Sequence, residues 1–113
     1  MSIVKIYGIK NCDTVKKALK YLINKDIHHQ YIDLRIDTIS EKEFQAMTEA
    51  IGLELLINKR SATFRLLTDH EKNNINYELV LKLPTLIKRP VLIKGEKIIV
   101  GFNENEYDNF LTN

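Results

Sequence analysis

With 113 residues, the chain has room for a single domain built around one hydrophobic core. Hydrophobic residues make up 44% of it and charged residues 28%, as in ordinary globular proteins, and a formal net charge of +2 is too small to require nucleic acid or an anionic membrane as partner. No run reaches the roughly 18 apolar residues of a membrane-spanning helix, so we expect a protein that contacts neither a membrane nor nucleic acid directly.

The first elements are predicted to be a strand, a helix and a second strand. The segment "IVKIY", residues 3–7, is typical of a short strand. Apolar residues then recur at the spacing of one helical face: Val15, Ala18, Leu19 and Leu22. The segment "HQYIDLR", residues 29–35, is typical of a second strand. Because the connection between the strands runs through a helix, we expect them to be parallel.

The middle of the chain is predicted to be helical. Two capping boxes mark helix starts, formed by Ser40 with Glu43 and by Thr68 with Glu71. The first of these helices is expected to run to Gly52. Residues 53–83 are expected to continue as a helical segment whose internal boundaries the pattern does not define, up to the stop that Pro84 imposes.

The last part of the chain changes to two β-branched runs and a helix. The segment "VLIKGEKIIVG", residues 91–101, has Gly95 and Glu96 between its two runs, and glycine first in a two-residue loop favours a type II′ hairpin. Asn103 and Glu106 are placed to cap a C-terminal helix. The order βαβ, helical segment, ββα predicts an α/β fold with a mixed four-stranded sheet, for which a thioredoxin-like fold is the natural candidate.

Cys12, the single cysteine, lies between the first strand and the first helix. One cysteine cannot form an internal disulfide, which fits the reducing cytoplasm. If the helix begins near Asp13 or Thr14, the N–H groups and positive dipole end of its first turn favour a thiolate, and Lys10 adds a positive charge. The alternative is a half-buried, unreactive cysteine, since free cysteine is among the most frequently buried residues. The position in the loop favours the nucleophile.

Three motifs occur in order along nearly the whole chain: "YGIKNCDTVKKAL", "LLINKRSATFR" and "IKRPVLIKGEKIIVGF". Together they resemble the arsenate reductase ArsC/Spx family, and the wording around Cys12 is most similar to the ArsC-like proteins proposed to be glutathione-dependent thiol reductases. The resemblance implies a single thioredoxin-like domain, residues 1–113, with a helical insertion at about residues 40–88.

The resemblance also implies roles for residues in each motif. Cys12 is the expected nucleophile. Arg60 and Arg89 are expected to bind an anion, because the planar guanidinium fork suits oxyanions and carboxylates. Pro90 is the expected cis-proline that faces the cysteine.

Two positions depart from the family pattern. Arsenate reductases of this type carry a third arginine where this chain has Val100, which argues against arsenate as the physiological substrate. Spx-type regulators commonly carry the second cysteine of a redox switch where this chain has Val15, so an internal switch is excluded. Arg35 and Arg65 are better explained as solvated charges, although Arg65 is close to Arg60 in sequence.

We expect no metal site and no bound cofactor. His28 and His29 are adjacent on an extended chain, so their side chains point to opposite faces, and no cysteine or paired acid lies at ligand spacing. A solvated turn before the second strand explains both histidines.

Two functions fit these features. In the first, the protein is a thiol-dependent oxidoreductase: Cys12 attacks an oxyanion or a disulfide, and glutathione or another small thiol resolves the adduct as co-substrate, with a glutaredoxin-type protein as a further partner. In the second, the protein is an Spx-type regulator that binds the RNA polymerase alpha subunit. The missing second cysteine and the wording around Cys12 favour the first.

Overall fold

The computed structural model describes residues 3–112 and divides the chain into two compact units. The first unit consists of Met1–Asp37 and Arg89–Asn113, and the second is the continuous segment Thr38–Lys88. The second unit covers the segment that the family resemblance treats as an insertion, while the assignment of the whole chain to one domain stays a prediction. Among residues 3–112, no helix combines the length and the apolar character that crossing a bilayer requires.

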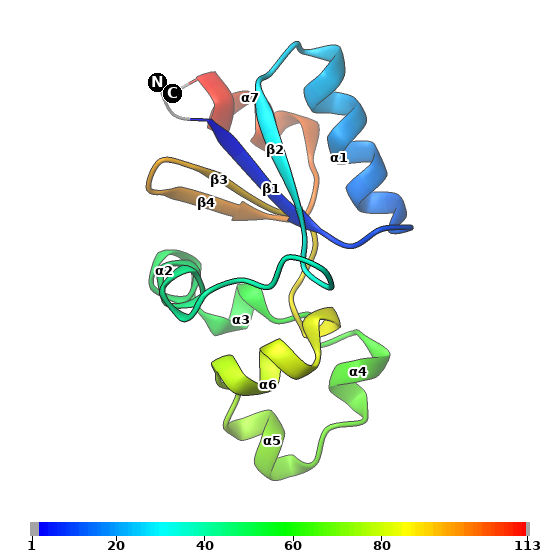
Figure 1. Ribbon diagram of the computed structural model, residues 1–113, viewed down its shortest axis with the longest axis vertical. Helices are drawn as coiled ribbons and strands as arrows, with labels where there is room; N and C mark the ends of the chain where they lie inside the picture. The colour runs from blue at the N-terminus through cyan, green and yellow to red at the C-terminus, as the bar shows by residue number, and fades with distance from the viewer. Residues whose placement is uncertain (1–2, 113) are drawn as a thin grey trace. The chain divides into compact units, whose positions relative to one another are not determined.

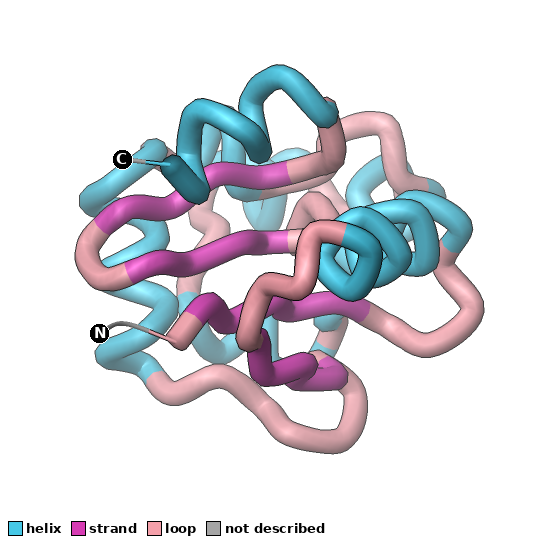
Figure 2. The backbone as a smooth tube through the Cα atoms, turned by 90° about the horizontal axis from the view of Figure 1, so that it is seen from above, coloured by secondary structure: helices cyan, strands magenta, loops and turns pink. Residues whose placement is uncertain are grey.

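The first unit is built on a sheet that has four strands within the described residues: β1 (Val4–Gly8), β2 (His29–Asp33), β3 (Val91–Lys94) and β4 (Lys97–Val100). The strand order is β2-β1-β3-β4 (Figure 1). β1 and β2 are parallel, whereas β3 runs antiparallel to both β1 and β4. Figure 2 shows the strands side by side. The predicted mixed sheet is therefore confirmed, as is its parallel first pair.

Two helices of the first unit, α1 (Asp13–Asn24) and α7 (Glu104–Thr112), share one buried cluster with the sheet. Its members are Val4, Ile6, Ala18, Tyr21, Leu22, Leu92, Tyr107 and Phe110. Burying one large apolar side chain contributes about 1.5–3 kcal/mol. The cluster therefore fixes α1 on the sheet, and with it the loop that leads from β1 into α1.

The hairpin between β3 and β4 has the predicted two-residue loop. Lys94 pairs with Lys97, which leaves Gly95 and Glu96 in the loop. Gly95 has a φ of 62°, and Glu96 is not among the non-glycine residues of the described chain with positive φ. Positive φ at the first loop position alone is the signature of a type II′ turn.

The second unit consists of short helices: α2 (Glu41–Ile51), α3 (Leu53–Leu56), α4 (Ala62–Arg65), α5 (Asp69–Asn73), α6 (Tyr77–Lys82) and the 3₁₀ helix η1 (Pro84–Leu86). Both predicted capping boxes are present, with Glu43 N–H donating to Ser40 Oγ and Glu71 N–H to Thr68 Oγ1, each at 3.1 Å. The expected helical segment 53–83 is divided into several helices, because new N-caps begin inside it.

Candidate active site

The chemistry-bearing residues of the first unit gather at one edge of its sheet. Gly8 pairs with Asp33, so the carboxyl ends of β1 and β2 lie together. Tyr7 pairs with Val91, which brings the residues just before β3 to the same edge. The loop that contains Cys12 leaves β1 at this edge. The carboxyl ends of adjacent parallel strands are a common location for binding sites in α/β proteins.

The backbone around Cys12 turns sharply into α1. Asn11 has a φ of 68°, a left-handed conformation that asparagine adopts more readily than most residues. Cys12 is the N-cap of α1, with φ −99° and ψ 122°, and its carbonyl accepts the N–H of Lys16 at 3.0 Å. No side chain caps this helix. The first-turn N–H groups therefore stay available to a negative charge, and the half-buried thiol lies at this positive end.

Asp33 connects the Cys12 loop to the end of β2. It is the one polar or charged residue among residues 3–112 that is buried, at 7% exposure. Its Oδ2 accepts the N–H of Lys10 at 3.3 Å, and its Oδ1 accepts the N–H of Arg35 at 2.9 Å. The N–H of Leu34 also donates to the carbonyl of Gly8 at 2.8 Å. These bonds fix the loop before Cys12 against the turn after β2.

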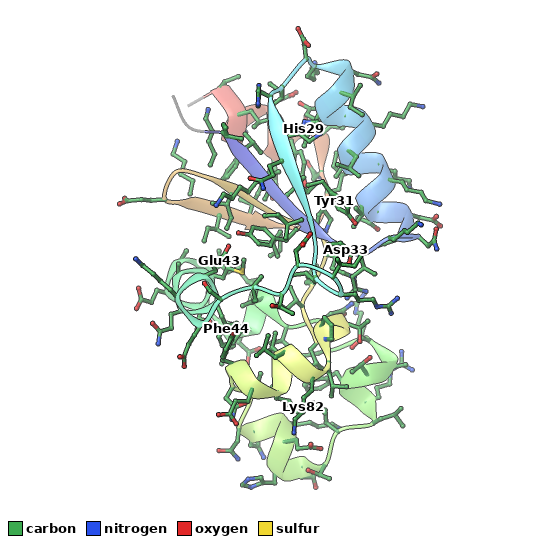
Figure 3. The ribbon with its side chains drawn as sticks, in the orientation of Figure 1. His29, Tyr31, Asp33, Glu43, Phe44 and Lys82 are labelled. Atoms are coloured by element: carbon green, nitrogen blue, oxygen red, sulfur yellow. The ribbon has the colours of Figure 1, made fainter. Side chains whose placement is uncertain are left out.

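Tyr31 covers the same loop from β2. Tyr31 and Asp33 both extend from this strand (Figure 3). A Cβ atom placed on Gly8 would lie 2.8 Å from both Cγ atoms of Val15 and 3.3 Å from Cε1 of Tyr31. The ring of Tyr31 and the first turn of α1 thus meet over Gly8, and only a residue without a side chain fits beneath them. Burial, followed by the charges of Asp33 and Cys12, raises the pKa of Tyr31.

Arg89 and Pro90 precede β3 at this edge. The Arg89–Pro90 peptide bond is cis, as the family resemblance implied. Pro90 is buried and its carbonyl accepts the N–H of Gly101 at 2.8 Å, while the Nε of Arg89 is buried. Val100, where the family resemblance implies that arsenate reductases carry a third arginine, pairs with Val91. The roles of Arg89 as anion ligand and of Pro90 as the residue facing the sulfur stay predictions.

Arg60 belongs to the second unit, where its side chain is exposed. Its N–H donates to Oδ1 of Asn58 at 3.1 Å, and its carbonyl accepts Nη2 of Arg65 at 2.7 Å. The sequence predicted that Arg65 is a solvated charge. In the structure its side chain also donates a hydrogen bond to the backbone of Arg60. The role of Arg60 at the Cys12 site stays a prediction.

Within the described residues, no group of three or more histidine, cysteine, aspartate or glutamate side chains could hold a metal ion. His29 uses its Nδ1 to contact the carbonyl of Ile27 at 2.8 Å.

The sequence did not assign Tyr31 or Asp33 to the site. The side chain of Arg35 is exposed, in keeping with the solvated charge that the sequence predicts, while its backbone N–H shares the carboxylate that also holds the loop before Cys12. The available signal was the acidic residue at the end of a predicted strand, beside a loop with a candidate nucleophile.

The mixed sheet, with a single cysteine at the start of the helix after β1, defines a thioredoxin-like protein. Comparison with known proteins narrows this class. The ArsC family profile matches residues 7–110, and the chain belongs to the ArsC family.

Two relatives illustrate the range of this family. An uncharacterized protein of Haemophilus influenzae is 43% identical over 108 residues, which cover 92% of this chain and 95% of that protein. The global transcriptional regulator Spx of Listeria innocua is 32% identical over 114 residues, which cover 96% of this chain and 86% of that protein. The family resemblance inferred from the motifs is thus confirmed, including its Spx branch.

Solved structures give the same assignment. The YFFB protein superposes with a TM-score of 0.86 at 32% identity. The superposition covers 94% of this chain and 96% of the YFFB chain. An arsenate reductase (ArsC) related protein from Brucella melitensis superposes with a TM-score of 0.73 at 34% identity and covers 96% and 94% of the two chains. The fold class is confirmed by these neighbours.

Proposed function

We propose that this protein is a thiol-dependent oxidoreductase whose nucleophile is Cys12 and whose adduct is resolved by glutathione or another small external thiol. The observation that supports it most is the position of Cys12 at the N-terminus of α1, where no side chain caps the helix. A thiolate is stabilised there by backbone N–H groups and by the helix dipole. The proposal also places the protein in the reducing cytoplasm, where a single unpaired thiol persists.

The proposed reaction is thiol–disulfide exchange in two steps. The Cys12 thiolate attacks one sulfur of a small disulfide, a new S–S bond forms, and the electron pair of the broken bond leaves with the other sulfur as a thiolate. A second thiolate then attacks the mixed disulfide and releases Cys12. In this scheme Arg89, Arg60 and Lys10 bind the carboxylates of the substrate. A glutaredoxin-type protein is a further candidate for the second step.

The chain favours a disulfide over arsenate as substrate. Val100 stands where a third arginine would bind the oxyanion, and one charge-assisted hydrogen bond contributes about 1.5–3 kcal/mol. We therefore expect weak arsenate reduction in an assay coupled to glutathione and glutaredoxin. Robust turnover of arsenate in that assay would overturn this preference.

The test of the proposal is formation of a mixed disulfide. The purified protein is incubated with glutathione disulfide, and intact-mass spectrometry measures glutathione attached to Cys12. We expect stoichiometric, thiol-reversible modification of the wild type and none of the matched Cys12→Ser variant. A folded wild-type protein whose Cys12 stays unmodified contradicts the proposal.

A second candidate function is an Spx-type regulator that binds the RNA polymerase alpha subunit. The observation that favours it is the 32% identity to Spx of Listeria innocua over 96% of this chain. With a single cysteine, such a regulator would have no internal disulfide switch. Titration of purified alpha subunit separates the two functions: saturable binding that survives Cys12→Ser supports the regulator, whereas absence of binding leaves the oxidoreductase.

A further inference from the structure

Tyr31 offers a hydroxyl group beside the Cys12 loop. Its ring lies over Gly8 and next to Val15, in the first turn of the helix that Cys12 begins. The residue is 37% exposed, so part of its side chain is open to a small molecule from solvent. Within residues 3–112, the Tyr31 hydroxyl donates to no protein acceptor, which leaves its proton for a bound molecule.

The carboxylate of Asp33, two residues further along β2, already has other donors. Each carboxylate oxygen of Asp33 already accepts a backbone N–H, from Lys10 and from Arg35. The charges of Asp33 and Cys12 both act on the phenol. Together with burial they raise its pKa above the ordinary value of 10.0, so the hydroxyl keeps its proton at neutral pH and remains a donor.

Thiol–disulfide exchange creates negative charge on the sulfur that leaves. The more basic the leaving thiol, the slower it departs, and a hydrogen-bond donor near that sulfur stabilises the developing charge. The leaving sulfur is the second sulfur of the substrate disulfide and lies farther from Cys12 than the attacked sulfur. A donor near Cys12 that is not hydrogen-bonded to Cys12 itself can therefore donate to the leaving sulfur.

We propose that the hydroxyl of Tyr31 donates a hydrogen bond to the leaving sulfur when Cys12 attacks a disulfide, which makes disulfides of basic, aliphatic thiols the favoured substrate class. This inference rests on the proposed oxidoreductase function. In the step, the Cys12 thiolate forms a bond to the nearer sulfur and the S–S bond of the substrate breaks. The leaving sulfur takes the electron pair and is later protonated by solvent, so Tyr31 itself remains protonated.

The test compares Tyr31→Phe with the wild type in three reactions of Cys12. The first is exchange with glutathione disulfide, which has a basic aliphatic leaving thiol. The second is exchange with an aromatic disulfide such as dithiobis(nitrobenzoate), whose leaving thiol is acidic. The third is alkylation by iodoacetamide, in which iodide leaves instead of sulfur. Phenylalanine keeps the ring over Gly8, so the packing next to Val15 is retained.

We expect Tyr31→Phe to slow the glutathione disulfide reaction about 3- to 10-fold, the effect of one hydrogen bond. The aromatic disulfide should be slowed less than 2-fold, and alkylation should be unchanged. The matched control is Tyr77→Phe in the second unit, which removes a phenol that donates to the carbonyl of Ile39 at 2.8 Å. It should leave all three rates unchanged.

Each other outcome has a definite meaning. If Tyr31→Phe alters the three reactions equally, or alters none, the inference is wrong while the proposed function stands. If the wild type forms no mixed disulfide with glutathione, the proposed function fails, and this inference fails with it.

Discussion

Helix α1 of the first unit begins differently from most helices of the second unit. In the second unit, α2, α4, α5 and α6 each start at a residue whose side chain accepts a backbone N–H, namely Ser40, Ser61, Thr68 and Asn76. α3, a single turn directly after α2, has no such cap. In the first unit, α7 also has such a cap, because the N–H of Glu106 donates to Oδ1 of Asn103 at 3.1 Å. In contrast, α1, the longest helix of the described chain, starts at Cys12 without a side-chain cap.

The caps of the second unit contribute to the stability of its helices, whereas the uncapped start of α1 leaves N–H groups that can bind an anion. Helices of one or two turns are marginal in water, so their caps, each worth about 0.5–2 kcal/mol, matter for the second unit. α1 has 12 residues and buries Val15, Ala18, Tyr21 and Leu22 against its unit. Packing holds α1 without help at its N-terminus, and the first-turn N–H groups remain for a thiolate or a substrate anion.

The largest effect should come from the buried cluster that holds α1 on the sheet of the first unit. Leu92 is fully buried in the cluster that joins β3 to α1 and α7. Leu92→Ala should lower the free energy of unfolding by about 2–5 kcal/mol, because it removes buried contacts and leaves a cavity. Urea denaturation measures the loss. The matched Leu92→Met variant should lose less than about 1.5 kcal/mol; equal losses would mean that this cluster does not carry α1.

The next effect concerns the buried carboxylate at the site. Asp33→Ala leaves the N–H groups of Lys10 and Arg35 without their acceptor, and a hydrogen bond to a charged group contributes about 1.5–3 kcal/mol. We expect a loss of this size in urea denaturation, together with faster amide exchange at Lys10. Asp37→Ala, at an exposed acid of the same turn, is the control and should change stability by less than about 0.5 kcal/mol. Unchanged exchange at Lys10 would show that Asp33 does not fix the loop.

Alkaline pH should weaken the first unit through Tyr107. This residue is 1% exposed and its hydroxyl donates to the carbonyl of Gly101 at 2.8 Å. Burial, followed by the charge of Glu106, raises the pKa of Tyr107 far above its ordinary value of 10.0. Above pH 10 the unfolded chain therefore releases a proton that the folded protein keeps, so the stability from this group is present below pH 10 and lost as pH rises.

Tyr107→Phe measures this loss. At pH 8 the variant should be less stable than the wild type by about 0.5–1.5 kcal/mol, since the hydrogen bond to Gly101 is removed. Above about pH 10.5 the difference should shrink by about 1.4 kcal/mol per pH unit, because the variant has no proton to lose at this position. Unfolding by urea between pH 8 and 11 gives both numbers. A difference that stays constant with pH would contradict the assigned direction.

The smallest effects test the contrast in capping directly. Ser40→Ala removes the acceptor of the Glu43 N–H and should cost about 1 kcal/mol of stability. Cys12→Ala removes no cap hydrogen bond from α1 and should change the free energy of unfolding by less than about 0.5 kcal/mol. Thermal or urea denaturation of the two variants measures the two losses of stability. If Cys12→Ala costs as much as Ser40→Ala, the sulfur is part of the structure of the helix start.

Features that depend on neighbouring residues could be predicted from the sequence. The apolar spacing from Val15 to Leu22, the capping box at Ser40 and the loop at Gly95 are all local patterns, and the structure contains each of them. Between 53 and 83 the capping box at Thr68 predicted one helix start, and the structure contains it. The other boundaries there were not predicted, because several caps and short apolar runs compete within a few residues. Caps such as Ser61 and Asn76 each provide one hydrogen bond without the second bond of a capping box, which is too weak a signal to divide a segment in advance.

The missed part of the candidate site depends on strand register. Asp33 and Lys10 are 23 residues apart, and they meet only because Gly8 pairs with Asp33 in the parallel ladder. A shift of one residue would turn Tyr31 and Asp33 to the other face of the sheet. The sequence around these two residues does not specify that register, so neither could be assigned to the site from sequence alone.

The division of the first unit into two sequence segments has a consequence for synthesis. β1, α1 and β2 leave the ribosome first, but β3, which pairs with the other side of β1, follows only after Thr38–Lys88. The continuous second unit is complete in sequence once Lys88 has been added, before any residue of β3. A chain that stops before Val91 therefore carries the cysteine motif after β1 while one side of β1 still lacks its partner strand. The unit that carries Cys12 can therefore be completed only after β3 and β4 have been synthesised.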